Sequence, residues 1–172
     1  MKIKNITEFS ELLKFCFSEE YKALEISEQK NIKTEIKKSV DQIDGAVHEL
    51  EIVISSELER ICYNRFCGNT EKVFFIIECL PAEKIKSIII KYVNGNLFKE
   101  KGNYADYELV TQMLEYLPEA FKIKVFEEAN IKKTLEIMSK FNKIANNWRV
   151  SKKKRKYYKD YYNICKKALA SE

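Results

Sequence analysis

Glycine and proline are scarce in this chain, and this scarcity limits the folds that it can adopt. The 172 residues include four glycines and two prolines, whereas average usage would give about 20 of the two together. Tight turns depend on these residues, which argues against a sandwich or barrel of many short strands. Hydrophobic residues make up 45% of the chain, and a chain of this length buries roughly two-thirds of its unfolded surface. A globular core is therefore expected, and a disordered chain is excluded.

Apolar residues recur at three- and four-residue steps along most of the sequence, the period of an amphipathic helix. The pattern predicts a first helix over residues 6–24 and a second from Ser27 to Phe66, interrupted only by Gly45. If continuous, the second helix would be roughly 60 Å long, more than the width of a compact domain of this size. We expect it to bend near Gly45 or to project and pair with a second copy. It has too few clean heptads for a coiled coil, which favours a core helix.

The middle of the chain contains a weak internal repeat. Residues 69–81 align with residues 106–118 at an offset of 37, and each copy ends in proline before another apolar-periodic stretch. Proline is tolerated at the start of a helix, because its missing N–H would be unpaired there. Each copy is therefore predicted to form a helix, a sharp turn and a helix. Two copies are too few for a stacked array, which needs about three.

Two segments keep a β interpretation open. Residues 85–93 are rich in β-branched residues, and residues 121–126 alternate apolar residues with lysine, as a half-buried strand would. A small sheet is the alternative to helices there. Residues 94–103 hold two of the four glycines, so this segment is the predicted mobile loop.

The overall expectation is an all-α fold, with helical hairpins packed as a bundle or short solenoid around one long helix. Helical spacing continues over residues 131–145, and a break at residues 146–147 or at Ser151 precedes a last helix. Residues 1–148 would form the helical body. Residues 149–172 would form a basic C-terminal helix, either part of the same domain or a tail.

The five cysteines form an odd set without CxxC spacing, and a chain with this much core does not need disulfides. We interpret them as reduced and mostly buried. The N-terminus lacks the continuous apolar stretch of a signal peptide, and no apolar run approaches the roughly 20 residues that cross a bilayer. The expectation is a cytoplasmic protein, or a nuclear one in a eukaryotic host, without a membrane partner.

Residue types that catalyse reactions or bind metals are sparse. The single histidine, His48, lies midway along the long predicted helix without a nucleophile motif beside it, a pattern typical of a surface or packing residue. Cys62 and Cys67 with one distant histidine do not supply four zinc ligands, and no glycine-rich phosphate loop occurs. We expect no metal, no cofactor and no enzymatic activity, and a catalytic His48 is the enzymatic alternative.

The net charge of +5 is unevenly distributed along the chain. Residues 149–172 carry nine cations and two acids, a net charge of +7, so residues 1–148 carry 5 − 7 = −2. The five consecutive cations at 152–156 repel one another, and if Ser151 caps the last helix they also lie at its positive end. A polyanion would relieve both costs, because phosphates neutralise cations and release counterions.

The predicted function is that of a small non-enzymatic protein that binds nucleic acid or a nucleoprotein through this basic helix. Its cations would contact the phosphate backbone, and Tyr157 would stack on bases, because the other tyrosines of the helix are assigned to its buried face. The candidate nucleic-acid-binding residues are Arg149, Lys152, Lys153, Lys154, Arg155, Lys156, Tyr157 and Lys159.

Four alternatives stay open for the basic segment. It could be a solvated lysine-rich helix whose tyrosines pack on the body. It could be a nuclear localisation cluster in a eukaryotic host. A membrane-surface helix is disfavoured, because its apolar face is tyrosine rather than leucine, phenylalanine and tryptophan. The fourth alternative is a protein–protein adaptor or inhibitor that acts through a helical surface.

Overall fold

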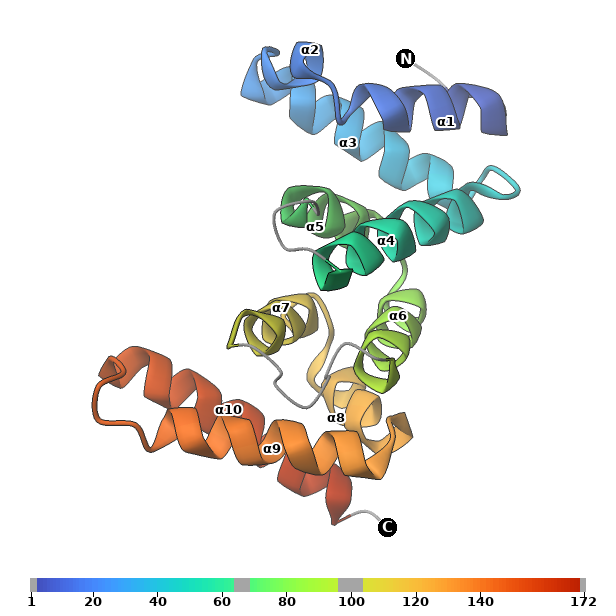
Figure 1. The fold of residues 1–172 in the computed structure, drawn as a ribbon. Coiled ribbons are helices and arrows are strands. Elements are labelled where there is room, and N and C mark those ends of the chain that lie inside the picture. Colours follow the sequence, from blue (N-terminus) through green and yellow to red (C-terminus); the bar gives the residue numbers. More distant parts are fainter. Residues whose placement is uncertain (1–2, 64–68, 96–103, 171–172) are drawn as a thin grey trace. The chain divides into compact units, whose positions relative to one another are not determined.

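The part of the chain that the structure describes folds into α-helices. The computed structural model describes residues 3–63, 69–95 and 104–170, which form ten α-helices and contain no strand (Figure 1). The all-α prediction is confirmed. The chain divides into two compact units, residues 1–81 (unit 1) and residues 82–172 (unit 2).

The described residues of unit 1 form five helices. They are α1 (Ile6–Phe15), α2 (Glu19–Lys22), α3 (Ile26–Val40), α4 (Ala46–Tyr63) and α5 (Thr70–Cys79). Helix α1 packs against α3 and α4, and α5 packs against the same two helices. The core of unit 1 includes the fully buried Phe9, Ile36, Ile54 and Ile76, one from each of these four helices.

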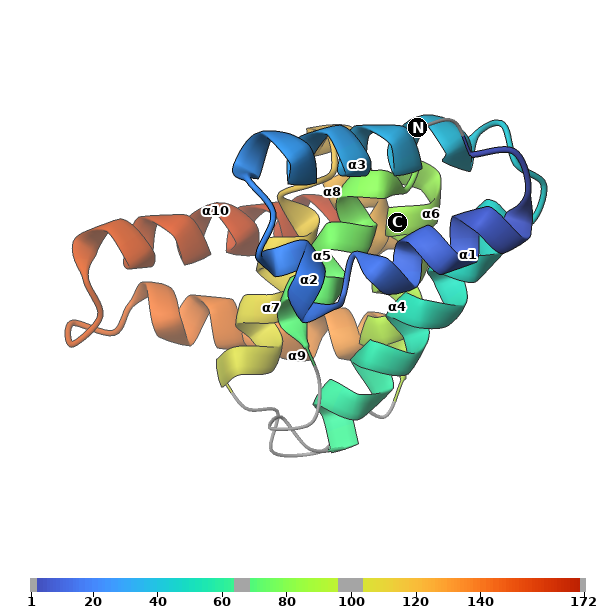
Figure 2. The same ribbon diagram turned by 90° about the horizontal axis from the view of Figure 1, so that it is seen from above.

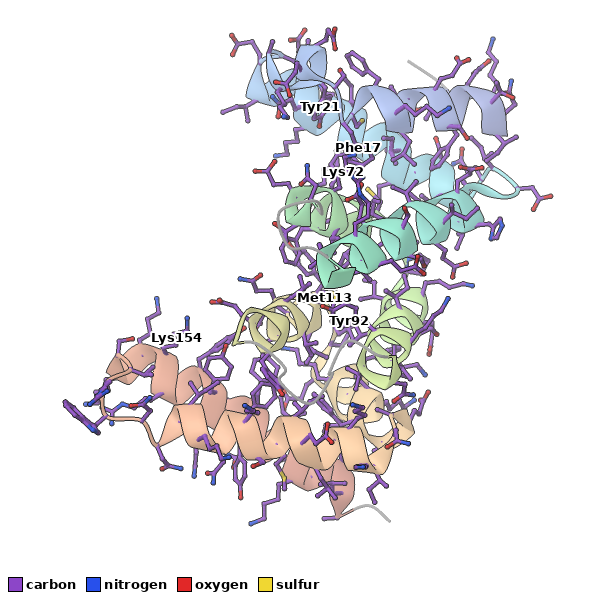
Figure 3. All side chains as sticks on the ribbon, in the orientation of Figure 1. Phe17, Tyr21, Lys72, Tyr92, Met113 and Lys154 are labelled. Carbon is purple, nitrogen blue, oxygen red and sulfur yellow. The ribbon has the colours of Figure 1, made fainter. Side chains whose placement is uncertain are left out.

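The predicted first helix over residues 6–24 is divided in two. Helix α1 ends at Phe15, and α2 begins after Ser18, whose hydroxyl accepts a hydrogen bond from the Tyr21 backbone N–H at 3.2 Å. A serine in this position satisfies a backbone donor that a new helix start leaves unpaired. Beside this break, the Lys72 ammonium lies 5.1 Å from the centroid of the Phe17 ring (Figure 3).

The single long helix predicted from Ser27 to Phe66 is wrong in the described part of the chain. Helix α3 ends at Val40 and α4 starts at Ala46, and Gly45 between them has a φ of +82°. This left-handed conformation is strained for a residue with a Cβ atom but not for glycine. The predicted bend near Gly45 is thus a complete break, and α3 packs against α4. Pairing of a projecting long helix with a second copy loses its basis.

A buried carboxylate joins the end of α4 to the start of α5. Glu57 is only 5% exposed, and its oxygens accept hydrogen bonds from the Asn69 N–H at 3.1 Å and from Arg60 at 3.2 Å. The Lys72 ammonium lies 3.4 Å from the same carboxylate. Burial of a charge is tolerated when it is paired in this way. Glu57 is therefore explained by the fold of unit 1.

In unit 2 the residues that the structure describes also form five helices. They are α6 (Ala82–Asn94), α7 (Tyr104–Leu114), α8 (Glu119–Glu128), α9 (Ile131–Ala145) and α10 (Lys152–Leu169). Helix α6 packs against α7 and α8, while α10 packs against α8 and α9. The buried Tyr92 of α6 and Met113 of α7 belong to this core (Figure 3).

The β alternative is wrong for both segments. Residues 85–93 lie inside α6, where the buried Ile85, Ile88, Ile89, Tyr92 and Val93 follow a helical period. Residues 121–126 lie inside α8. Burial on one helix face therefore outweighs the β propensity of the branched side chains.

The helix, turn, helix order predicted for both repeat copies is confirmed. Helix α6 begins directly after Pro81 and α8 directly after Pro118. The boundary between the two units falls at the first of these turns. The predicted mobile loop at 94–103 lies outside the described residues except for its first two positions.

Candidate nucleic-acid interface

The basic segment lies in a helical hairpin of unit 2. Helices α9 and α10 run side by side, and the chain turns between them over residues 146–151 (Figures 1 and 2). The break predicted at this point is confirmed. The buried ring of Phe141 on α9 has its centroid 5.5 Å from that of Tyr158 and 5.9 Å from that of Tyr161, both on α10. Aromatic packing thus holds the basic helix on its neighbour.

A polar network fixes α10 to the C-terminal end of α7 as well. The Tyr161 hydroxyl donates to Glu115 Oε1 at 2.6 Å and lies 3.2 Å from the carbonyl oxygen of Thr111. The Lys122 ammonium of α8 lies 3.5 Å from Glu115 Oε2. Burial and the Glu115 carboxylate raise the pKa of Tyr161 far above its usual range. Tyr161 is therefore a neutral hydrogen-bond donor at physiological pH.

Replacement of Glu115 by glutamine is expected to lower stability by about 1 kcal/mol at neutral pH. Partial burial acts to raise the pKa of the Glu115 carboxyl, but the Tyr161 hydrogen bond and the Lys122 charge outweigh it, so the pKa is lowered. A carboxyl with a lowered folded-state pKa contributes stability above its unfolded-state pKa, and this is lost as the pH falls through the folded-state value. Urea unfolding of both proteins should show the difference at pH 7 and its loss below the ordinary carboxyl pKa of 4.5.

The matched control for this variant is Glu136→Gln. Glu136 pairs with Lys133 at 3.4 Å on the exposed surface of α9, and exposed pairs of this kind contribute at most about 0.5 kcal/mol. The role assigned to the network would be contradicted if both substitutions lowered the free energy of unfolding equally. It would also be contradicted if the loss caused by Glu115→Gln did not change with pH.

The cations at 152–156 occupy the positive end of α10. Ser151 caps the helix, because its hydroxyl accepts a hydrogen bond from the Lys154 N–H at 3.3 Å. The first turn of α10 contains no acidic residue. Cations near a helix N-terminus oppose the helix dipole. The unfavourable arrangement expected from the sequence is therefore present in the structure.

The candidate cations differ in their exposure and partners. Lys154 is half-buried, and its ammonium lies 3.1 Å from Glu108 Oε1 of α7 (Figure 3). The Lys159 ammonium lies 5.2 Å from the centroid of the Tyr162 ring. Arg155 is half-buried, and the exposed candidate cations are Arg149, Lys152, Lys153, Lys156 and Lys159. Within residues 3–63, 69–95 and 104–170, Lys152, Lys153, Arg155 and Lys156 form no ion pair.

The prediction that Tyr157 is the exposed aromatic residue is wrong. Tyr157 is half-buried, and its ring centroid lies 5.1 Å from that of Tyr161 and 5.5 Å from that of Tyr158. Burial raises the pKa of its hydroxyl. The buried face of α10 consists of Tyr158, Tyr161, Ile164, Cys165 and Ala168, and Tyr157 lies at the edge of this helical stripe.

Trp148 is the aromatic residue that the sequence reasoning missed. It lies in the turn between α9 and α10 and is 79% exposed. The Arg149 guanidinium lies 5.3 Å from the centroid of its ring. One feature of the sequence indicates that Trp148 is exposed: it directly follows Asn146 and Asn147, at the predicted helix break.

The two units carry charges of opposite sign. Unit 1 has 11 cations and 15 acids, a net charge of −4, whereas unit 2 has 20 cations and 11 acids, a net charge of +9. The α9–α10 hairpin at residues 131–170 has 13 cations and two acids, a net charge of +11 that exceeds the charge of the whole unit. The candidate site therefore includes lysines of α9 that were not among the predicted residues.

The other chemistry-bearing residues do not form a second site in the part of the chain that the structure describes. His48 is exposed on α4, and no three His, Cys, Asp or Glu residues come close enough to hold a metal ion. Burial raises the pKa of the free thiols of Cys16 and Cys79, to about 12 and about 11, so they are protonated at neutral pH. Cys165 is also buried and free, while the side chains of Cys62 and Cys67 lie outside the described residues.

None of the described helices combines the length and the apolar character needed to cross a membrane. Comparison of the chain with models of protein families, with curated proteins and with solved structures found no match.

Proposed function

We propose that this protein binds nucleic acid, free or in a nucleoprotein, through the basic hairpin of unit 2 and acts without catalysing a reaction. The observation that carries the proposal is the row of cations at the start of α10, four of which lack an ion pair among the described residues. Their placement at the positive helix end is costly in the free protein. Bound phosphates would neutralise these charges and release counterions, which makes binding favourable.

The test is a binding isotherm of the full chain measured at several salt concentrations. If six cations each meet a phosphate, the logarithm of the affinity should fall with the logarithm of the salt concentration at a slope of roughly −5 for duplex. A fluorescence-anisotropy titration with labelled duplex and labelled single strand gives this slope directly. A flat salt dependence, or no binding to either ligand at low salt, would refute the proposal.

The alternative is a protein partner. Ile131 and Leu135 lie one helical turn apart on α9 and are 50% and 46% exposed, so this surface favours an adaptor or inhibitor function. Binding through apolar side chains depends much less on salt than binding through phosphates. A partner that remains bound in high salt and after nuclease treatment would support this alternative.

A further inference from the structure

Trp148 is exposed to an extent that packing does not explain. It is the only tryptophan of the chain, and 79% of its surface is accessible at the turn between α9 and α10. Tryptophan is normally well buried in globular proteins, because it contributes a large apolar surface. The Arg149 guanidinium lies over the ring at 5.3 Å, and the high exposed fraction leaves the opposite ring face accessible.

The turn holds Trp148 in a defined position. The Asn147 side-chain oxygen accepts a hydrogen bond from the Arg149 N–H at 3.0 Å. The Asn147 carbonyl accepts another from the Val150 N–H at 3.0 Å, and the Asn147 N–H donates to the Ile144 carbonyl at 3.2 Å. These hydrogen bonds order the backbone on both sides of Trp148. Presentation by an ordered turn lowers the conformational entropy that binding would otherwise cost.

We propose that Trp148 stacks on an unpaired base and that the preferred ligand of the basic hairpin is single-stranded nucleic acid. This inference rests on the proposed function of the same hairpin. Base faces are accessible in single strands, whereas in a duplex they are covered by neighbouring base pairs. Proteins that bind single strands combine a basic surface along the backbone with aromatic rings that stack on bases.

The surroundings of Trp148 supply both parts of this arrangement. Four exposed cations follow within eight residues, namely Arg149, Lys152, Lys153 and Lys156. Tyr157 is half-buried, because its ring packs on Tyr161. Trp148 is therefore the accessible ring of the candidate segment. A membrane surface is the less favourable ligand, because the apolar face of α10 is packed within unit 2 and one exposed ring gives little area for insertion.

The test uses intrinsic fluorescence, since the single tryptophan of the full chain reports on its own surroundings. The four probes are an oligothymidine of about 20 nucleotides, a blunt duplex of equal length, a sugar-phosphate strand without bases, and vesicles rich in phosphatidylserine. Oligothymidine should quench the fluorescence. The base-free strand should compete for the cations but leave the fluorescence unchanged. Equal quenching by the base-free strand, or a response to the vesicles alone, would overturn the inference.

Two variants separate this inference from the proposed function. Trp148→Ala should weaken binding of oligothymidine about 5- to 150-fold and change duplex binding less than twofold, whereas Trp148→Phe should restore most of the loss. The stacking alone would be refuted if Trp148→Ala bound oligothymidine fully while binding was lost on neutralisation of four cations, Lys152, Lys153, Arg155 and Lys156. If the wild-type chain bound neither oligothymidine nor duplex, both the proposed function and the stacking of Trp148 would be refuted.

Discussion

Replacement of Lys152, Lys153, Arg155 and Lys156 by glutamine is expected to weaken nucleic-acid binding on the order of 10³-fold at 0.1 M salt. These four cations form no ion pair among the described residues. Three of them, Lys152, Lys153 and Lys156, are exposed to phosphates, and Arg155 is half-buried. Each phosphate contact contributes about 0.9 to the salt slope for duplex. The slope should therefore become shallower by about 3.6, and anisotropy titrations over a range of salt concentrations will measure both changes.

The same substitutions should stabilise the free protein. Lysine, arginine and glutamine have similar helix propensities. Lys152, Lys153 and Arg155 lie in the first turn of α10, and removal of each charge there relieves an unfavourable dipole interaction of about 0.3–1 kcal/mol at low salt. Lower affinity combined with higher stability cannot result from unfolding. Lower affinity with lower stability would contradict the electrostatic explanation.

A matched control separates local placement from net charge. Lys14, Lys30, Lys37 and Lys38 are exposed on α1 and α3 of unit 1, and their replacement by glutamine changes the net charge by the same amount. This control variant should bind nearly as tightly as the wild type, because the cations proposed to contact phosphates are unchanged in it. Equal losses in both variants would mean that overall charge, rather than the hairpin, governs binding.

Replacement of Phe141 by alanine is expected to destabilise unit 2 by about 3–5 kcal/mol. Phe141 is fully buried and contacts Tyr158 and Tyr161 on α10, and its ring centroid lies 6.3 Å from that of Tyr107 on α7. Its truncation removes these aromatic contacts and leaves a cavity in the place where α10 is attached. Because domains are typically stable by only 5–15 kcal/mol, the loss should be large in urea unfolding followed by circular dichroism.

Leu135→Ala is the control for this variant. Leu135 is on the same helix and is 46% exposed, so its truncation should cost less than about 1 kcal/mol. Similar destabilisation by the two substitutions would mean that the aromatic cluster does not hold the hairpin together.

The sequence was informative where one local signal dominates. Pro81 and Pro118 each mark a helix start, and Ser151 caps α10 as its position before the lysine run indicates. The helical period of Ile85, Ile88 and Ile89 was present in the sequence, but the high β propensity of isoleucine kept a strand possible. The burial of these side chains in the folded protein favours the helix over the strand, and the pattern of burial cannot be obtained directly from a single sequence.

The failures have equally local causes. Apolar spacing continues across Gly45, so the pattern could not show that this glycine adopts a positive φ and reverses the chain. The buried face of α10 includes Tyr158 and Tyr161 as expected, but it is wide enough that the neighbouring Tyr157 is half-buried as well. The exposure of Trp148 depends on its position in the turn, which hydrophobicity alone does not indicate.

The division of the chain into two units has a consequence for the way in which a polyanion would approach it. Unit 1 carries −4 and unit 2 carries +9, so a strand of phosphates attracts one unit and repels the other. Long-range fields of this kind steer diffusing partners before any contact forms. Productive encounters would therefore begin at unit 2, and the association rate would fall steeply as salt is added. The negative charge of unit 1 would disfavour non-specific binding of the polyanion to the surface of that unit.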